Sequence, residues 1–215
     1  MSERRESAGS IILGTVTVMS AVGAGIFASW LLRRRYYPNP DTLRQALTSG
    51  SETARALIGL LDLHAADLAN ARLSQSMLGF SMLDSLNLTS AELNDSVIGL
   101  CSLNGAKLAG AKLDSVVFGL CNLVGADFTN ASLRGAVFDL SLLHGTNFTG
   151  ADLENAQIKV VGCDHETTLP DGSKWAPDTV WTRFTDPDDP AFWRAGDPTS
   201  PAYSAEISTL PAPEH

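Results

Sequence analysis

Apolar residues recur with a strict period of five between Ala56 and Val160. Over twenty-one consecutive units the third residue is almost always Leu, Ile or Phe and the first is usually Ala, Ser or Cys, as in ADLAN, AKLAG and ADLEN. An amphipathic helix needs apolar residues three and four apart, so a period of five does not suit it. In extended backbone, residues one and three of a unit point to one side and residue two points to the other. Each unit therefore predicts a short strand with two inward side chains, followed by a turn.

A longer period of twenty lies over the period of five. Similar phrases begin at residues 56, 76, 96, 116 and 136, namely ALIGL, SMLGF, SVIGL, VVFGL and AVFDL. Four units then make one circuit with a square cross-section, and coils stacked at about 4.8 Å make residues 56–155 a rod roughly 24 Å long. Cys101 and Cys121 are expected at equivalent inward positions one circuit apart, and so are Phe128 and Phe148.

The units follow the pattern Ala-(Asp/Asn)-Leu-x-x, and in this they resemble the pentapeptide-repeat family. The resemblance covers about half of the chain, the segment 56–160. It implies an all-β solenoid, a right-handed quadrilateral parallel β-helix of about five coils. It implies little about function, because one fold of this kind hosts many roles.

One side of the predicted rod differs from the other three in its outward residues. There, positions two and five are apolar and Gly59, Gly79, Gly99 and Gly119 lie between them, whereas the other sides show mainly polar residues. Such a strip, a few hundred Å² in area, is large for a surface left bare. We call it the apolar side, and its outward residues form a candidate docking face: Leu57, Leu60, Met77, Phe80, Val97, Leu100, Val117, Leu120, Val137 and Leu140.

Three occupants of the apolar side remain open from the sequence. The chain itself could cover it, with its aromatic C-terminal segment or with a helix over 41–57. A homodimer or a separate protein partner is the second occupant. The third is the surface of a membrane. All three are binding roles, and none is catalytic.

Residues Ser10 to Leu32 contain no charged side chain. Such a run of 23 residues gives about 34 Å of helix, enough to cross a hydrocarbon core of roughly 30 Å. A cleaved signal peptide is the alternative, but the run is too long for the apolar part of one. We therefore expect a single-pass transmembrane helix, and the arginines that follow it place the C-terminal domain in the cytoplasm. The expected membrane-interface residues are Trp30, Arg33, Arg34, Arg35, Tyr36 and Tyr37.

The segments around the repeats are expected to cap the rod, because bare ends would expose its core and strand edges. Residues 1–9 form an N-terminal tail, and 33–55 a linker and a short capping helix with Asp41 as its N-cap. Residues 161–194 form a C-terminal cap, in which LPDG makes a turn and large aromatic residues dock. The Pro-, Ser- and Ala-rich segment 195–215 predicts a disordered tail.

Few residues in the sequence are candidates for catalysis or for metal binding. Cys101 and Cys121 are expected as small buried thiols, and Cys163, Asp164, His165 and Glu166 lack the spacing of a familiar metal site. No nucleophile elbow, phosphate loop or metal-binding helix motif is present in the sequence. The sequence thus predicts no enzyme, no cofactor, no metal and no small-molecule substrate.

Net charge argues against one class of function, the binding of nucleic acid. The chain carries a net charge of −9, and its basic residues are concentrated before residue 56, so phosphate-backbone binding by the repeats is not expected. The main hypothesis is a membrane-anchored, non-enzymatic scaffold that presents the apolar side to a protein partner or to a second copy. The alternative is implied by the resemblance: some pentapeptide-repeat proteins resemble duplex DNA in shape and charge and bind DNA gyrase, a type II topoisomerase.

Overall fold

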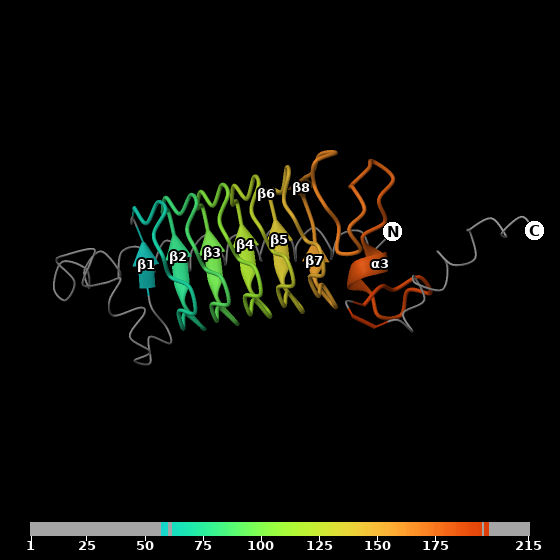
Figure 1. The fold of residues 1–215 in the computed structure, drawn as a ribbon, viewed down its shortest axis with the longest axis horizontal. Helices are drawn as coiled ribbons and strands as arrows, with labels where there is room; N and C mark the ends of the chain where they lie inside the picture. The colour runs from blue at the N-terminus through green and yellow to red at the C-terminus, as the bar shows by residue number, and fades with distance from the viewer. Residues whose placement is uncertain (1–56, 60–61, 195, 198–215) are drawn as a thin grey trace, which may run out of the picture.

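The computed structural model describes residues 57–59, 62–194 and 196–197, and its repeats form a rod of stacked coils (Figure 1). A six-stranded parallel sheet runs along one side of the rod. Its strands are, in spatial order, β1 (Leu57–Gly59), β2 (Met77–Gly79), β3 (Val97–Gly99), β4 (Val117–Gly119), β5 (Val137–Asp139) and β7 (Gln157–Ile158). A second, two-stranded sheet joins β6 (Ser141–Leu142) to β8 (Val161–Gly162), and a short helix follows as α3 (Thr182–Thr185).

Every strand of the large sheet pairs with the strand that lies 20 residues further along the chain, as in Val97 with Val117. Three further ladders of isolated parallel bridges keep the same spacing, and they begin at Asp62, Asp67 and Arg72. The four ladders are thus five residues apart, which confirms four sides to each circuit. From Met77 to Gln157 the chain completes four circuits in this register. In chain order after the apolar side we call the others the second, third and fourth sides, represented by residues 101–105, 106–110 and 111–115.

The interior is filled by positions one and three of each unit, as the period predicts. From Leu63 to Ala156 these side chains are almost fully buried. Phe118 stacks on Phe138 with ring centroids 5.0 Å apart, and Phe128 stacks on Phe148 at 5.2 Å. Because each ring lies above the equivalent ring of the coil below, identical inward residues one circuit apart pack face to face.

The corners between the sides are tight turns, and their chemistry explains the polar part of the repeat. Ala106 N–H donates to the carbonyl of Leu103 at 3.0 Å, and Gly105 between them has a positive φ of 61°, as a type II turn requires. At position two, Asp or Asn accepts the backbone N–H of position four, as Asp127 does from Thr129 at 3.0 Å. The preference for Asp or Asn at position two is therefore a turn requirement.

The coil ladders run beyond Val160, where the sequence pattern ends. Ser141 pairs with Val161 in the 20-residue register, and Asn147 then pairs with Thr168, one residue out of period. The turn predicted at Leu169–Gly172 is confirmed, since Gly172 N–H donates to the carbonyl of Leu169 at 2.9 Å. A single extra residue is tolerated there because no full coil follows it.

The aromatic residues near the C-terminus close the end of the core. Trp181 meets the ring of Phe148 edge to face at 6.5 Å, and Phe184 lies between Trp181 and Trp193. An ion pair of 3.0 Å between Arg183 and Asp171 holds α3 to the preceding turn. Figure 1 shows α3 beyond β7 at the end of the rod. The aromatic segment thus covers the end of the coils.

Two predicted helices, the membrane span over 10–32 and the capping helix within 33–55, lie outside the described residues, as does the tail from 198 onward. Within the part that is described, none of the helices has the length and apolar character needed to span a membrane.

Candidate docking side

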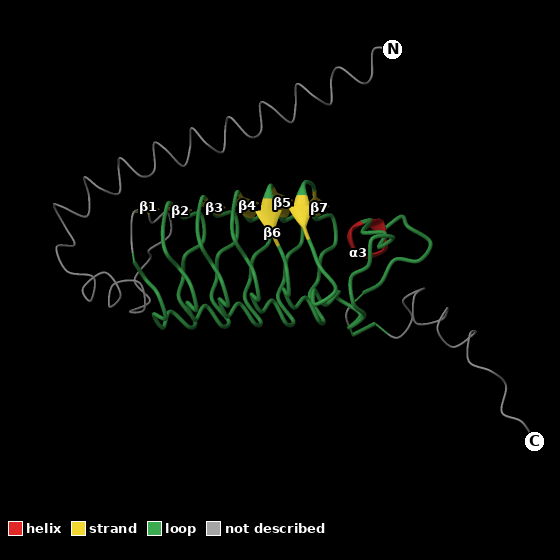
Figure 2. Ribbon diagram, turned by 90° about the horizontal axis from the view of Figure 1, so that it is seen from above, coloured by secondary structure: helices red, strands yellow, loops and turns green. Residues whose placement is uncertain are grey.

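The apolar side is built on β2 to β5, whose register places equivalent side chains directly above one another. Figure 2 shows the coils edge-on, stacked along the rod. The described members of the docking face point outward: Phe80, Leu120 and Leu140 remain 44%, 37% and 42% exposed. The position-two residues and Leu100 are half-buried between their neighbours in adjacent coils. Leu60 and the side chain of Leu57 lie outside what the structure describes.

Position five of the apolar side carries bulky apolar residues on a left-handed backbone. The φ values are 50° at Phe80, 56° at Leu100, 54° at Leu120 and 52° at Leu140. On the other sides position five also has positive φ, but there it is mostly Asn, Ser, Asp or Gly, which tolerate that conformation. For Leu or Phe it costs about 1–2 kcal/mol per residue. This strained conformation therefore recurs at the same position in four successive coils.

At the corner that follows the apolar side, position one is a hydrogen-bond donor, whereas it is usually Ala at the other corners. Position one of the second side is Ser or Cys in four successive coils, and the side chain donates to the carbonyl two residues before it: Ser81 to Gly79, Cys101 to Gly99, Cys121 to Gly119 and Ser141 to Asp139. The thiol contacts are 3.3 Å for Cys101 and 3.5 Å for Cys121, whose thiol also lies 3.3 Å from the carbonyl of Ile98 in the preceding coil. Both cysteine side chains therefore contact backbone carbonyls at this corner.

We predict that Cys121→Ser is tolerated and Cys121→Ala is not. Serine occupies the equivalent position at Ser81 and Ser141 and donates to the same carbonyl, so the free energy of unfolding should change by less than about 1 kcal/mol. Alanine leaves that buried carbonyl with one donor fewer and opens a small void, so it should cost about 1–2 kcal/mol. Urea unfolding of the two variants measures the difference. Equal loss in both would show that the thiol is held by packing alone.

Two exposed apolar residues widen the apolar side around this corner. Met82 and Leu142, at position two of the second side, are 56% and 45% exposed. They lie two residues after Phe80 and Leu140 in the chain, at either end of the strip. Between them the same position is polar, and Ser102 is held there by a hydrogen bond of 2.6 Å to Asp84. Sequence reasoning missed Met82 and Leu142, although their apolar character at a position that is otherwise polar was a usable signal.

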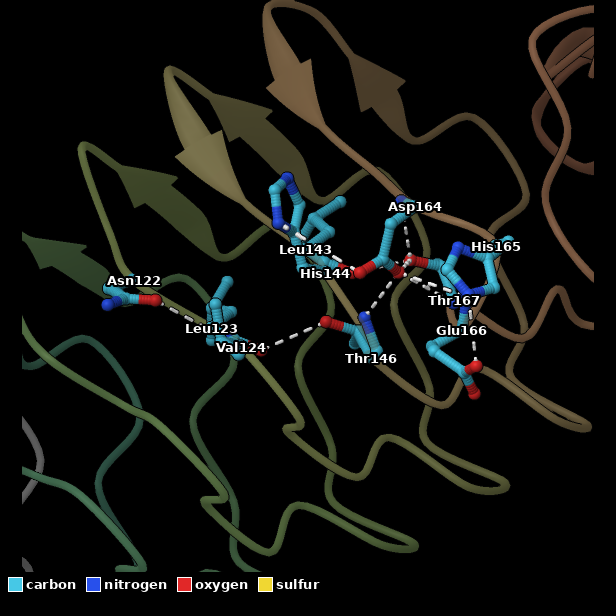
Figure 3. A network of polar contacts seen from close by, with 11 residues as sticks. Asn122, Leu123, Val124, Leu143, His144, Thr146, Asp164, His165, Glu166 and Thr167 are labelled. Carbon is cyan, nitrogen blue, oxygen red and sulfur yellow. Dashed lines mark hydrogen bonds and ion pairs between the residues drawn. The ribbon is translucent and has the colours of Figure 1, made fainter.

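The polar cluster at the end of the coils is structural. Figure 3 shows Asp164 between His144 on one side and Thr167 and Glu166 on the other, with dashed lines from its carboxylate to neighbouring groups. The carboxylate accepts N–H groups of Gly145 at 2.8 Å and of Glu166 and Thr167 at 3.1 Å each. The Gly145 N–H in particular holds the pKa of Asp164 below its usual range. The carboxylate oxygen Oδ1 of Asp164 therefore closes this turn.

Burial raises the pKa of all three cysteine thiols. It raises the pKa of Cys101 and of Cys163 to about 11, and that of Cys121 further still. A thiol needs a lowered pKa to act as a nucleophile at neutral pH. Among the residues described, no group of three or more His, Cys, Asp and Glu side chains is arranged to hold a metal ion.

Carboxylates on the other sides are bonded within the rod. Glu92 bridges the coils above and below through Lys112 at 3.0 Å and Arg72 at 3.2 Å, and these partners lower its pKa. Arg134 pairs with Asp152 at 3.3 Å and with Glu154 at 3.1 Å. These carboxylates are matched by cations or by turn N–H groups, so they do not form a row of free negative charge.

Comparison with known proteins agrees with this geometry. Residues 101–139 and 121–157 match the family model described as pentapeptide repeats, with 8 copies. The chain carries pentapeptide repeats. The resemblance and the parallel β-solenoid predicted from the sequence are thus confirmed, and the pentapeptide repeats are the units whose corners and ladders are described above.

Several solved structures of pentapeptide repeat proteins are similar to the chain. One from the thylakoid lumen of Arabidopsis thaliana is 29% identical, with a TM-score of 0.39, over 46% of this chain and 68% of that protein. QnrB1, a plasmid-mediated fluoroquinolone resistance protein, is 20% identical with a TM-score of 0.39, and the chain covers 63% of its length. A protein from Nostoc is 21% identical with a TM-score of 0.36, over 67% of this chain and 91% of that one. A search of the curated proteins found no match.

Proposed function

We propose that this chain is a membrane-anchored, non-enzymatic binding protein whose apolar side binds a protein. The observation that carries the proposal is the row of Phe80, Leu100, Leu120 and Leu140, which are outward-facing and on a left-handed backbone in four successive coils. A fold that needed only a corner would place Asn, Ser or Gly there, as the other sides do. Selection for an apolar binding surface accounts for the exception.

The location of the aromatic cap favours an external partner. Trp181 and Phe184 pack on the end of the core at Phe148, so this described segment is used at the end of the rod and leaves the apolar side exposed. The anchor is proposed from the uncharged run Ser10–Leu32 and from the arginines behind it, which favour a cytoplasmic rod.

The buried, high-pKa thiols and the occupied carboxylate of Asp164 support a binding role over an enzymatic one. The DNA-mimic alternative lacks comparable support. Over residues 62–160 there are ten acidic and five basic side chains, and carboxylates such as Glu92 are paired with cations of neighbouring coils. A mimic of duplex DNA needs rows of unpaired negative charge.

Cysteine accessibility in native membranes tests the proposal. In a Cys163→Ser background, we expect the full-length Leu120→Cys variant to be protected from a membrane-impermeant maleimide in membranes, and to react once solubilised in detergent and diluted. The Asn130→Cys variant is the matched control, because Asn130 occupies the same turn position on the third side, with φ of 56°. With inside-out vesicles as the membranes, it should react under both conditions.

Labelling in vesicles of known orientation tests on which side of the membrane the rod lies. The Asn130→Cys thiol should react in inside-out vesicles and remain unlabelled in right-side-out vesicles. Protection of Leu120→Cys that survives dilution in detergent would mean that the chain covers its own apolar side, and the binding proposal would then be wrong. Recovery of the protein in the soluble fraction after cell lysis would contradict the proposed membrane anchor.

A further inference from the structure

We infer that the apolar side binds a second copy of this chain, so that two rods stand in parallel with their apolar sides in contact. The inference rests on the proposed function, which supplies the exposed side and the shared membrane, and it goes beyond it by naming the partner. Four features of the described coils support it: their period, their side-chain sizes, their charge and the area of the strip.

The spacing of side chains along the apolar side is the same in two copies of the chain. Equivalent side chains recur every 20 residues in exact β register, so they repeat at about 4.8 Å along the rod. A second copy presents the same spacing over its whole height. An α-helix laid along the strip advances about 5.4 Å per turn and would drift about 0.6 Å per coil out of step. Continuous contact over four coils is therefore favoured for an identical ladder.

Side-chain sizes are complementary under two-fold symmetry. If the axis runs parallel to the rods, the chain direction is reversed across the interface, so position two of one copy faces position five of the other. The smaller Val117 then meets Leu120 of the partner subunit, and the reverse contact is made by symmetry. Gly119 lies between them in its own strand and carries no side chain, so it places no bulk between the valine and the leucine.

Charge favours the apolar side over the fourth side as a contact between copies. The outward positions of the apolar side from Met77 to Val160 include only two charged residues, Asp139 and Lys159, which hold the same position in successive coils and have opposite signs. The remaining sides carry nine acidic and four basic residues over 62–160. Most of these charges lie on the fourth side, which has five acidic and three basic residues, whereas the second side carries only Asp62 and Asp84. Because the cores of interfaces are depleted of charged residues, charge argues against the fourth side as the contact.

The area of the strip fits a contact between tethered copies. Four coils at about 4.8 Å and a width of roughly 15 Å give about 300 Å² per copy. A stable interface between free proteins buries about 800 Å² per partner. Two copies in one membrane share a high effective concentration, which compensates for a small contact, and anchors at the same end hold both rods parallel. A free soluble partner would lack this advantage.

Site-directed disulfide formation tests the inference. Two differently tagged full-length copies, both with Cys163→Ser, are expressed together; one carries Val117→Cys and the other Leu120→Cys. On mild oxidation of native membranes we expect a covalent dimer that contains both tags. The matched control places Lys112→Cys on one copy and Ser115→Cys on the other, which are positions two and five of the fourth side, and it should give no dimer.

One further cysteine pair tests the register of the two rods, and one pair of added asparagines tests which side is in contact. Val117→Cys with Phe80→Cys are two coils, about 10 Å, apart in a parallel dimer and should not join. Adding Leu100→Asn and Leu140→Asn to both copies should abolish the Val117–Leu120 disulfide, because the polar side chains remove the apolar contact while suiting the left-handed backbone at both positions.

The outcomes separate the inference from the proposed function. No disulfide at any pair, with Leu120→Cys still protected in membranes but reactive after solubilisation, would assign the side to another protein or to lipid, and the second copy would be excluded. Equal dimer yields for the experimental pair and the Lys112–Ser115 control would also exclude it, since they indicate random collision. Protection that persists on dilution in detergent would overturn both.

Discussion

Phe128→Ala is expected to lower the free energy of unfolding by about 3–5 kcal/mol. Phe128 is fully buried, stacks on Phe148 at 5.2 Å and meets Phe118 and Phe138 edge to face at 5.7 and 6.1 Å. Removing the ring leaves a cavity between stacked coils that cannot collapse, because the corners fix the width of each coil. Urea unfolding of the full-length protein in detergent, followed by tryptophan fluorescence, measures the loss.

The control for this experiment is Phe128→Leu. Leucine fills position three in most coils, as Leu108 does one circuit earlier, and should cost about 1–1.5 kcal/mol. A loss below 1 kcal/mol for Phe128→Ala would contradict the aromatic stack as the centre of the core.

Trp181→Ala is expected to detach the C-terminal cap. Its ring covers Phe148, and its carbonyl accepts the N–H groups of Phe184 and Thr185 at the start of α3. Losing a partly buried tryptophan should cost about 2–3 kcal/mol and expose the last coil. Limited proteolysis of the full-length protein should then cut residues 171–194 faster than in the wild type.

Val180→Ala is the matched control, because Val180 is adjacent in the chain and largely exposed. It should leave both the free energy of unfolding and the cleavage rate nearly unchanged. Unaltered proteolysis of Trp181→Ala would show that the ion pair between Arg183 and Asp171 holds the cap without the aromatic contact.

The architecture could be predicted because two nested periods fix it. A period of five requires a turn after every short strand, and a return of the same phrase after twenty residues fixes the number of sides. The stacking of Phe128 on Phe148 follows from that count alone. The position of the apolar side follows in the same way, since outward positions alternate with inward ones.

The corner chemistry could not be predicted from the period. Whether Cys101 fills space or donates to the carbonyl of Gly99 depends on the turn geometry of one corner, which a pattern of apolar residues does not contain. The strain at Leu120 was hidden for the same reason, because left-handed backbone is recognised in sequence only where Gly or Asn occupies it. The extension of the ladder to Thr168 was missed because one extra residue breaks the count while leaving the bridge intact.

The 20-residue register restricts how this protein can change in length. Deleting one five-residue unit would rotate every later coil by a quarter turn, so that Val117 and Val137 no longer lay above Val97. Duplicating or removing a whole circuit keeps all four ladders and changes the rod by about 4.8 Å. Insertions and deletions that selection tolerates inside the coils should therefore come in multiples of 20 residues, and each added circuit would lengthen the contact surface by one leucine and one valine.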